Sequence, residues 1–175
     1  YEVVVTGPDS VDADKICALG ARLSVIPMNK TGTNIIKDLR YCNALKTFLK
    51  KEKPDVVLAY TVKPVFYGAI AAKKAGIKNM NCMITGAGYT FTAKSFKAKV
   101  MGMLVRILYR YAFRKARTVI FQNPDDLKEF CERKLVNREK AYCVNGSGVN
   151  IDRFSAVALP DQPRFLMVSR LLKSK

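Results

Sequence analysis

The chain has 175 residues, of which 49% are apolar, so it can bury one sizeable hydrophobic core and is not a disordered protein. Its 31 Lys and Arg residues outnumber 14 Asp and Glu, and the formal net charge of +17 indicates an anionic partner: nucleic acid, acidic lipid or a phosphorylated substrate. There is no histidine, which removes the usual zinc ligand and the usual general base.

Strand and helix patterns alternate along the chain. Short apolar runs bounded by Gly and Pro predict strands at residues 1–6, 22–28, 55–60, 80–85, 118–122, 141–144 and 165–168. Apolar residues at three- and four-residue spacing predict helices at residues 12–19, 34–53, 64–75, 95–117 and 124–134. This alternation predicts an α/β fold built on a Rossmann-like, doubly wound parallel sheet.

The longest amphipathic pattern lies between residues 34 and 53. Its predicted buried stripe consists of Ile35, Leu39, Cys42, Leu45, Phe48 and Leu49. Asn123 is predicted to cap the helix that begins with Pro124-Asp125-Asp126, because these residue types are favoured at helix N-termini.

The five cysteines do not form a recognisable framework. They are odd in number, contain no C-x-x-C pair and lie at positions 17, 42, 82, 131 and 143. Several lie in apolar runs, as reduced core cysteines of a cytosolic protein do. The first residues show no secretory signal, and no apolar run approaches the roughly 20 residues of a spanning helix. We therefore expect a cytoplasmic protein without a metal site.

The end of the chain combines a linker with a cationic strand end. Residues 146–163 are rich in Gly, Ser, Asn and Pro, as an interdomain linker would be. The apolar run at 165–168 is followed by Ser169, Arg170 and, five residues later, Lys175. Ligands of open α/β sheets bind beyond the carboxyl ends of strands, and two cations there suit a pyrophosphate.

Two segments of this region resemble glycosyltransferase family 4. The sequence SGVNIDRF is similar to that family's interdomain pattern NGVD-x-x-RF, and SRLLKSK is similar to its second-domain opening GRL-x-x-x-KG. The family's diphosphate-binding Arg and Lys carry over to Arg170 and Lys175. Ser169 departs from the glycine of the pattern.

A third similar segment follows the strand at residues 55–60. Ala59-Tyr60-Thr61-Val62-Lys63-Pro64 resembles the T-x-K-P turn of a bacterial subgroup that acts on lipid-linked sugars, and YGAIAAKKAGI resembles the helix that follows it. Helix N-terminal amides and Lys63 could receive an anion there. The alternative is that Lys63 is a solvated loop residue and that the Ala and Gly face only packs on the sheet.

The loop after the next strand, ITGAGYTFT, resembles the subgroup's cleft loop ITG-x-G-Y-x-F. It predicts cleft residues Thr85, Gly86, Gly88 and Tyr89, beside Tyr60, Thr61 and Lys63 of the preceding turn. It fails as a dinucleotide fingerprint, since G-x-G-x-x-G would need glycine at Phe91. Many members of the family have a histidine in this cleft, but this chain contains none, so the resemblance implies no histidine role here. The alternative is a structural turn with Tyr89 and Phe91 in the core.

The helix predicted at 95–117 and the residue before it are strongly basic, and we predict membrane contact through Lys94, Lys97, Lys99, Arg106 and Arg110. The alternative is that the apolar stripe of this helix only faces the sheet. Nucleic acid is not expected as a partner, because the basic residues are scattered over all helices and no nucleic-acid-binding motif occurs.

The resemblance implies the acceptor-binding half of a GT-B fold. Residues 1–145 would form this domain, with a first strand preceding Tyr1; residues 146–163 would be the linker, and 164–175 the start of the nucleotide-sugar-binding domain. It implies a retaining hexosyl- or N-acetylhexosaminyltransferase of bacterial capsule, exopolysaccharide or lipopolysaccharide synthesis, peripheral on the inner face of the plasma membrane.

The implied substrates are a nucleotide-sugar donor and a membrane- or polyprenyl-diphosphate-linked acceptor, with no cofactor and no metal. The catalytic residues stay unknown, because the family's acidic pair belongs to the second domain, and residues 1–175 alone are expected to be inactive. Two alternatives remain: a nucleotide-sugar epimerase of the same fold, and a non-catalytic α/β domain that binds anions or membranes.

Overall fold

The computed structural model of the chain describes residues 1–29, 34–86 and 96–167. The strands are β1 (Val4–Gly7), β2 (Arg22–Val25), β3 (Val57–Tyr60), β4 (Met80–Ile84), β5 (Thr118–Phe121) and β6 (Ala141–Cys143). The helices are α1 (Ala13–Ala18), α2 (Ile35–Glu52), α3 (Val62–Ala75), α4 (Phe96–Lys115), α5 (Pro124–Glu132) and the 3-10 helix η2 (Arg138–Lys140). Each observed α-helix and each of these strands corresponds to a predicted element, with ends that differ by up to three residues.

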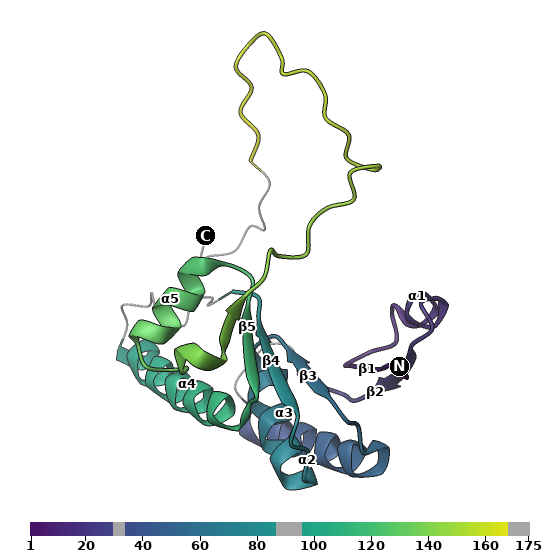
Figure 1. Cartoon of the computed structure of the whole chain (residues 1–175), viewed down its shortest axis with the longest axis vertical. Coiled ribbons are helices and arrows are strands. Elements are labelled where there is room, and N and C mark those ends of the chain that lie inside the picture. Colours follow the sequence, from purple (N-terminus) through teal and green to yellow (C-terminus); the bar gives the residue numbers. More distant parts are fainter. Residues whose placement is uncertain (30–33, 87–95, 168–175) are drawn as a thin grey trace.

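All strand pairs in the described part of the chain are parallel. β3, β4, β5 and β6 form one sheet in that order, while β1 and β2 form a separate pair. Adjacent strands in sequence are neighbours in the larger sheet, so each connection is a helical crossover (Figure 1). The predicted α/β class with parallel sheets is confirmed.

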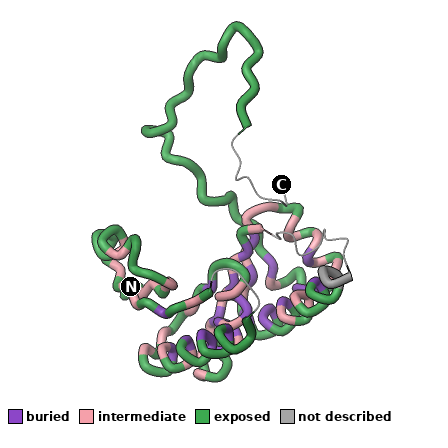
Figure 2. Tube along the Cα trace, turned by 180° about the vertical axis from the view of Figure 1, so that it is seen from behind, coloured by how far each residue is buried: buried purple, intermediate pink, exposed green. Residues whose placement is uncertain are grey.

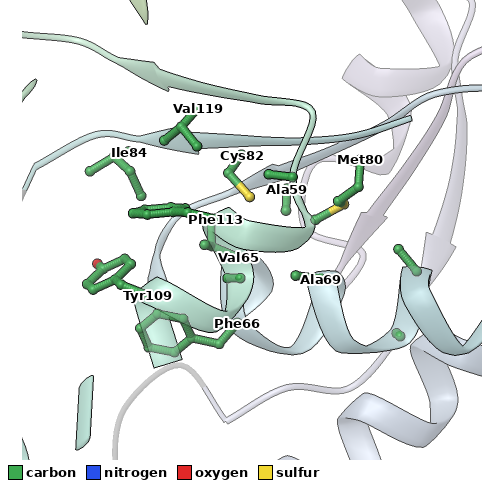
Figure 3. Packing of buried hydrophobic residues seen from close by; sticks show 14 of the residues in the cluster. Ala59, Val65, Phe66, Ala69, Met80, Cys82, Ile84, Tyr109, Phe113 and Val119 are labelled. Carbon is green, nitrogen blue, oxygen red and sulfur yellow. The ribbon is translucent and has the colours of Figure 1, made fainter. Parts of the chain in front are cut away.

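One face of the larger sheet carries the core. Along β4 the side chains alternate, with Met80, Cys82 and Ile84 at most 2% exposed, and they face α3 and α4 (Figure 3). On the other face Leu58 and Tyr142 remain 53% and 55% exposed. Figure 2 shows the buried positions concentrated where the helices meet the sheet.

Five aromatic rings join α3, α4, α5 and β5. The ring of Tyr109 lies 4.6 Å from that of Phe66, 5.2 Å from Phe113 and 5.1 Å from Phe130, centroid to centroid. Phe121 of β5 lies 5.3 Å from Phe130. Edge-to-face and offset rings of this kind add to the burial of their apolar area, so this cluster anchors the inner face of α4.

Small residues let α3 lie deep in the helical layer. Gly68, Ala69 and Ala72 are buried, and a Cβ on Gly68 would lie 3.5 Å from both Ala59 Cβ and Met80 Cε. α3 contacts α2, α4, β3 and β4. The Ala and Gly face of α3 therefore packs on the sheet, as the alternative interpretation of this segment held.

The predicted buried stripe of α2 is wrong at its first turns. Ile35 and Leu39 are 73% and 58% exposed, whereas Asp38 and Tyr41 are buried with Cys42, Leu45 and Leu49. Periodicity alone favoured the apolar residues. The structure instead turns Asp38 inward, because it has two hydrogen-bonding partners on α3.

The described residues of the strand predicted at 165–168, which was expected to begin a second domain, form no strand in this structure. Residues 165–167 have no strand partner, and Phe165 is 99% exposed. An apolar run forms a strand only when another strand pairs with it. Residues 144–167 are all exposed, and beyond Ser147 the segment extends away from the sheet (Figures 1 and 2).

Candidate functional site

The carboxyl ends of the parallel strands meet at one edge of the molecule. Tyr60, the last residue of β3, pairs with Met83 of β4, and Phe121 of β5 pairs with Ile84 and Cys143. The loops that follow these strands therefore start side by side. Ligands of open α/β sheets bind at this edge, and the sequence-predicted residues Tyr60, Thr61, Lys63, Thr85 and Gly86 all lie at it.

The turn after β3 has an unusual backbone at Thr61. Its φ of 72° and ψ of 174° lie in a region that only glycine adopts readily. The Thr61 N–H donates to the Met83 carbonyl at 3.3 Å, and the Thr61 carbonyl accepts from the Val65 N–H at 3.1 Å. Because of this conformation α3 begins at Val62, directly after the strand, and not at the predicted Pro64.

Lys63 is held by a carboxylate of the neighbouring helix. Its Nζ donates to Asp38 Oδ1 at 2.7 Å, and the Tyr67 hydroxyl, one turn further along α3, donates to Asp38 Oδ2 at 3.1 Å. The side chains of Lys63 and Asp38 are 17% and 8% exposed. Lys63 is thus not the solvated loop residue of the alternative interpretation.

The same contact raises the pKa of Tyr67. Burial, together with the hydrogen bond to the Asp38 carboxylate and its negative charge, raises the pKa of the Tyr67 hydroxyl to about 12. The hydroxyl stays protonated at neutral pH and keeps donating to Asp38. The contact between α2 and α3 therefore joins one anion, one cation and one neutral donor.

A pocket opens beside this turn. It has a volume of about 400 Å³ and is lined by Pro8, Met28 and residues 61–64. Pro8 and Met28 follow β1 and β2, so the pocket lies where the carboxyl ends of both sheets come together. A second depression, of about 480 Å³, lies on α5 and is lined by charged side chains. Two of these, Arg133 and Glu129, form an ion pair at 2.7 Å. Because this depression lies on one helix and not between strand ends, it is the weaker candidate for a ligand site.

Further along the edge, the loops after β4, β5 and β6 approach one another. Thr85 is exposed and Gly86 half-buried, and the Gln122 amide donates to Ser147 Oγ at 3.4 Å. Gly88 and Tyr89 lie outside the described residues. The predicted cleft role of these loops stays a prediction.

α4 is apolar on two opposite faces. Tyr109, Ala112 and Phe113 are at most 2% exposed on the inner face. The outer face presents exposed apolar side chains at helical spacing: Val100 (41%), Met103 (57%), Leu104 (48%), Ile107 (52%) and Tyr111 (37%). We call these five residues the outer face of α4. The core packing of the alternative interpretation therefore holds only for the inner face.

The predicted membrane-contact cations have different surroundings. Arg110 is exposed, yet its guanidinium donates to the carbonyls of Lys134 and Arg133, at 3.2 and 3.3 Å, beyond the end of α5. Arg106 is half-buried. Lys94 and the side chains of Lys97 and Lys99 lie outside the described part of the chain. Nothing in the structure tests their contact with lipid.

The donor-binding prediction falls outside the described residues, since Arg170 and Lys175 belong to 168–175. Among the described residues, no three His, Cys, Asp or Glu side chains gather as metal ligands would. In the same part of the chain, no helix combines the length and apolarity needed to cross a bilayer.

Sequence reasoning missed Asp38. The signal was present: Asp38 precedes Tyr41, Cys42 and Leu45 by three, four and seven residues, so it lies on the face of α2 that the core covers. A lone carboxylate on such a face needs a buried partner. The sequence could not show that Lys63 and Tyr67 of α3 supply it.

Two curated bacterial relatives align with most of the chain. The N,N'-diacetylbacillosaminyl-diphospho-undecaprenol alpha-1,3-N-acetylgalactosaminyltransferase of Campylobacter jejuni is 24% identical over 170 residues, which is 97% of this chain and 45% of that protein. The UDP-Gal:alpha-D-GlcNAc-diphosphoundecaprenol alpha-1,3-galactosyltransferase of Escherichia coli is 29% identical over 135 residues, 77% of this chain and 33% of that protein. The chain thus spans less than half the length of these relatives.

Solved structures share the fold. MurG of Acinetobacter baumannii superposes with a TM-score of 0.52 at 13% identity, over 85% of this chain and 37% of that protein. The UDP-N-acetylglucosamine 2-epimerase of Rickettsia bellii has the same TM-score at 17% identity, over 81% and 36%. Residues 1–123 match the family described as glycosyl transferase 4-like, which is more than half of the chain. The chain therefore belongs to the glycosyl transferase 4-like family.

Proposed function

We propose that the protein transfers a sugar from a nucleotide-sugar donor to a polyprenyl-diphosphate-linked acceptor in bacterial glycan synthesis. The observation that carries this proposal is the alignment with two glycosyltransferases whose names both specify an acceptor on diphospho-undecaprenol. The family match supports the reaction class. The pocket between the strand ends supports the location of the site.

The turn after β3 is assigned to the acceptor. Residues 61–64 line the pocket. The first turn of α3 lies there and offers the backbone amides of Val62 and Lys63, since Pro64 has none, and amides at a helix N-terminus favour a diphosphate. Thr85, Gly86, Gly88 and Tyr89 would form the adjoining wall. In this assignment the acceptor hydroxyl is oriented by residues that precede the linker at 146–163.

The donor diphosphate is assigned to Arg170 and Lys175. Two cations can stabilise the negative charge that develops on a departing nucleoside diphosphate, which removes the need for a metal ion. Transfer with retention at the anomeric carbon is part of the proposal, and the catalytic residues are not assigned. The sugar is a hexose or an N-acetylhexosamine, as in the two aligned relatives.

The outer face of α4 is proposed to contact an anionic bilayer from the cytoplasmic side. α4 contains no Asp or Glu, and the exposed cations Arg110, Arg114 and Lys115 flank its exposed apolar residues. An apolar stripe between cations matches a lipid surface with anionic headgroups. A second copy of the chain is disfavoured, because two such cationic faces repel each other.

The transfer reaction can be tested with the full-length protein. We would combine a panel of nucleotide-sugars with polyprenyl-diphosphate sugars and measure acceptor-dependent release of nucleoside diphosphate. We expect Arg170→Ala and Lys175→Ala to reduce the rate strongly, while Lys50→Ala on the exposed end of α2 leaves it unchanged. Product NMR would show the anomeric configuration, and activity should persist with EDTA. Acceptor-independent epimerisation of a donor would overturn the proposal.

The bilayer contact can be tested by vesicle flotation. The double variant Leu104→Ser and Ile107→Ser should bind phosphatidylglycerol vesicles about tenfold less tightly or worse. Fully burying one such side chain contributes about 1.5–3 kcal/mol, and each of the two still has about half of its surface to bury. Ile35→Ser with Ile36→Ser, on an exposed part of α2, is the matched control and should bind normally. Equal binding by both double variants would show that the outer face of α4 does not contact the bilayer.

A further inference from the structure

The turn that bears the proposed acceptor site is held in a costly conformation. Thr61 occupies a backbone region that is open mainly to glycine, and Lys63 is helical although it precedes Pro64, which sterically disfavours that conformation. The Thr61 side chain makes no capping hydrogen bond, and the first turn of α3 has no acidic residue. Local sequence therefore does not explain why α3 starts at Val62.

Asp38 supplies what the local sequence does not. Its carboxylate binds Lys63 in the first turn of α3 at 2.7 Å and Tyr67 in the second turn at 3.1 Å, so it fixes the position and rotation of the start of the helix. Asp38 also belongs to the first turn of α2, which Asn34 caps through the Lys37 N–H at 3.1 Å. One carboxylate thus complements the positive ends of two helices, which explains why it is tolerated at 6% exposure.

We propose that Asp38 is a positioning residue for acceptor binding, which acts by holding Lys63 and the strained Thr61 turn in their binding shape. The inference rests on the proposed acceptor site beside this turn. The proposal changes the role of Lys63, because its ammonium binds Asp38 and not the acceptor. The acceptor diphosphate is then bound chiefly by the backbone amides of Val62 and Lys63, which the Asp38 contact orients. The donor half of the reaction does not depend on Asp38.

The test separates the acceptor from the donor. In the protein at gene length, Asp38→Asn should raise the KM for the polyprenyl-diphosphate acceptor about tenfold or more, because small displacements of a binding group cost that much. The KM for the nucleotide-sugar should stay within about twofold, since the donor is assigned to another part of the chain. Tyr67→Phe, which removes one of the two contacts, should raise the acceptor KM less.

Substitution of Lys63 provides a second test of the proposal. If Asp38 acts through Lys63, Lys63→Met raises the acceptor KM to a similar extent, and the double variant is no worse than either single one. If Lys63 instead binds the acceptor directly, Asp38→Asn frees its ammonium, and the acceptor KM falls or stays unchanged while Lys63→Met raises it. That second pattern would overturn the proposal.

A second, more exposed ion pair at the other end of α2 controls for general loosening of this helix. Glu52 near the C-terminus of α2 accepts from Arg22 at 2.6 Å, far along the helix from Asp38. Glu52→Gln should leave both KM values unchanged. Equal effects of Glu52→Gln and Asp38→Asn on the acceptor KM would refute a positioning role.

Hydrogen exchange distinguishes failure of this inference from failure of the proposed function. In Asp38→Asn the hydrogen-bonded amides of Thr61 and of residues 65–67 should exchange faster, while those of β4 and β5 stay protected. Unchanged exchange at these amides would refute the inference even in an active transferase. Faster exchange in a protein that shows no transfer would refute the proposed function and leave the structural role of Asp38 in place.

Discussion

The inner and outer faces of α4 have similar apolar compositions and opposite surroundings. The inner face places Tyr109 and Phe113 in the aromatic cluster with α3 and α5, at 0% and 2% exposure. The outer face leaves Leu104 and Ile107 half exposed between cations. Apolar side chains contribute to stability only where the fold removes them from water, so the two faces should respond differently to the same kind of substitution.

The largest effect is expected on the inner face. Phe113→Ala should lower the free energy of unfolding by about 3–5 kcal/mol, because it removes buried area and leaves a cavity beside Tyr109. Urea denaturation followed by circular dichroism measures this change. Tyr111→Ala, two residues earlier and on the outer face, is the control and should change stability by less than about 1 kcal/mol. Similar losses for both variants would contradict the distinction between the faces.

Charge reversal beside the outer face should act on binding and not on stability. Arg114→Glu with Lys115→Glu should weaken binding to phosphatidylglycerol vesicles by about 1 kcal/mol or more per residue, and should flatten the dependence of binding on salt. Lys50→Glu with Lys51→Glu makes the same change in net charge at the end of α2. If both pairs weaken binding equally, net charge alone and not the face of α4 determines it.

An intermediate effect is expected at alkaline pH. Burial raises the pKa of the Tyr109 hydroxyl well above its ordinary value of 10. Above pH 10 the unfolded chain ionises this group first, so the folded state binds more protons and the free energy of unfolding falls, by about 1 kcal/mol per pH unit. Below pH 10 the group is protonated in both states and contributes nothing to the pH dependence.

Comparison with Tyr109→Phe isolates this contribution. Tyr41 and Tyr67, whose pKa values burial raises to about 12, are present in both proteins and affect both alike. The variant should therefore show a shallower loss of stability between pH 10 and 12 in urea denaturation. Parallel curves for the two proteins would show that Tyr109 is ionised as easily in the folded state as in the unfolded chain.

The smallest effect is expected from the same variant at pH 7. Among the described residues, the Tyr109 hydroxyl is buried without a hydrogen-bond partner, so its removal costs no such bond. We expect Tyr109→Phe to change the free energy of unfolding by less than about 1 kcal/mol, in contrast to Phe113→Ala. A loss above about 2 kcal/mol would indicate that the hydroxyl has a partner.

Local patterns predicted most elements correctly where capping residues and apolar periodicity agreed. Asn34 and Asn123 cap α2 and α5 as their residue types favour, and Gly76 ends α3 in the left-handed conformation, at a φ of 81°. The same patterns failed at Pro64 and at residues 165–167. At Pro64 the difference follows the backbone conformation of Thr61, and residues 165–167 have no neighbouring strand with which to pair.

The candidate site was predictable in outline and not in its contacts. The alternation of strands and helices placed Tyr60, Thr61, Lys63 and Thr85 at one edge, because parallel strands bring their carboxyl ends together. The ion pair between Asp38 and Lys63 could not be predicted, since it joins residues 25 positions apart on two different helices. The sequence likewise indicated that α4 is basic and apolar, without showing which apolar residues the core covers.

The sequence by itself determined the parallel α/β class, the order of its elements and the excess of positive charge, because periodicity, turn residues and charge are local properties. Only the tertiary structure decided that Asp38 turns inward, that Thr61 adopts a strained backbone and that Leu104 and Ile107 stay exposed. These features depend on how α2 and α4 pack against α3, and on how α3 packs against the sheet. Burial and ion pairing are properties of that packing, and no single segment carries them.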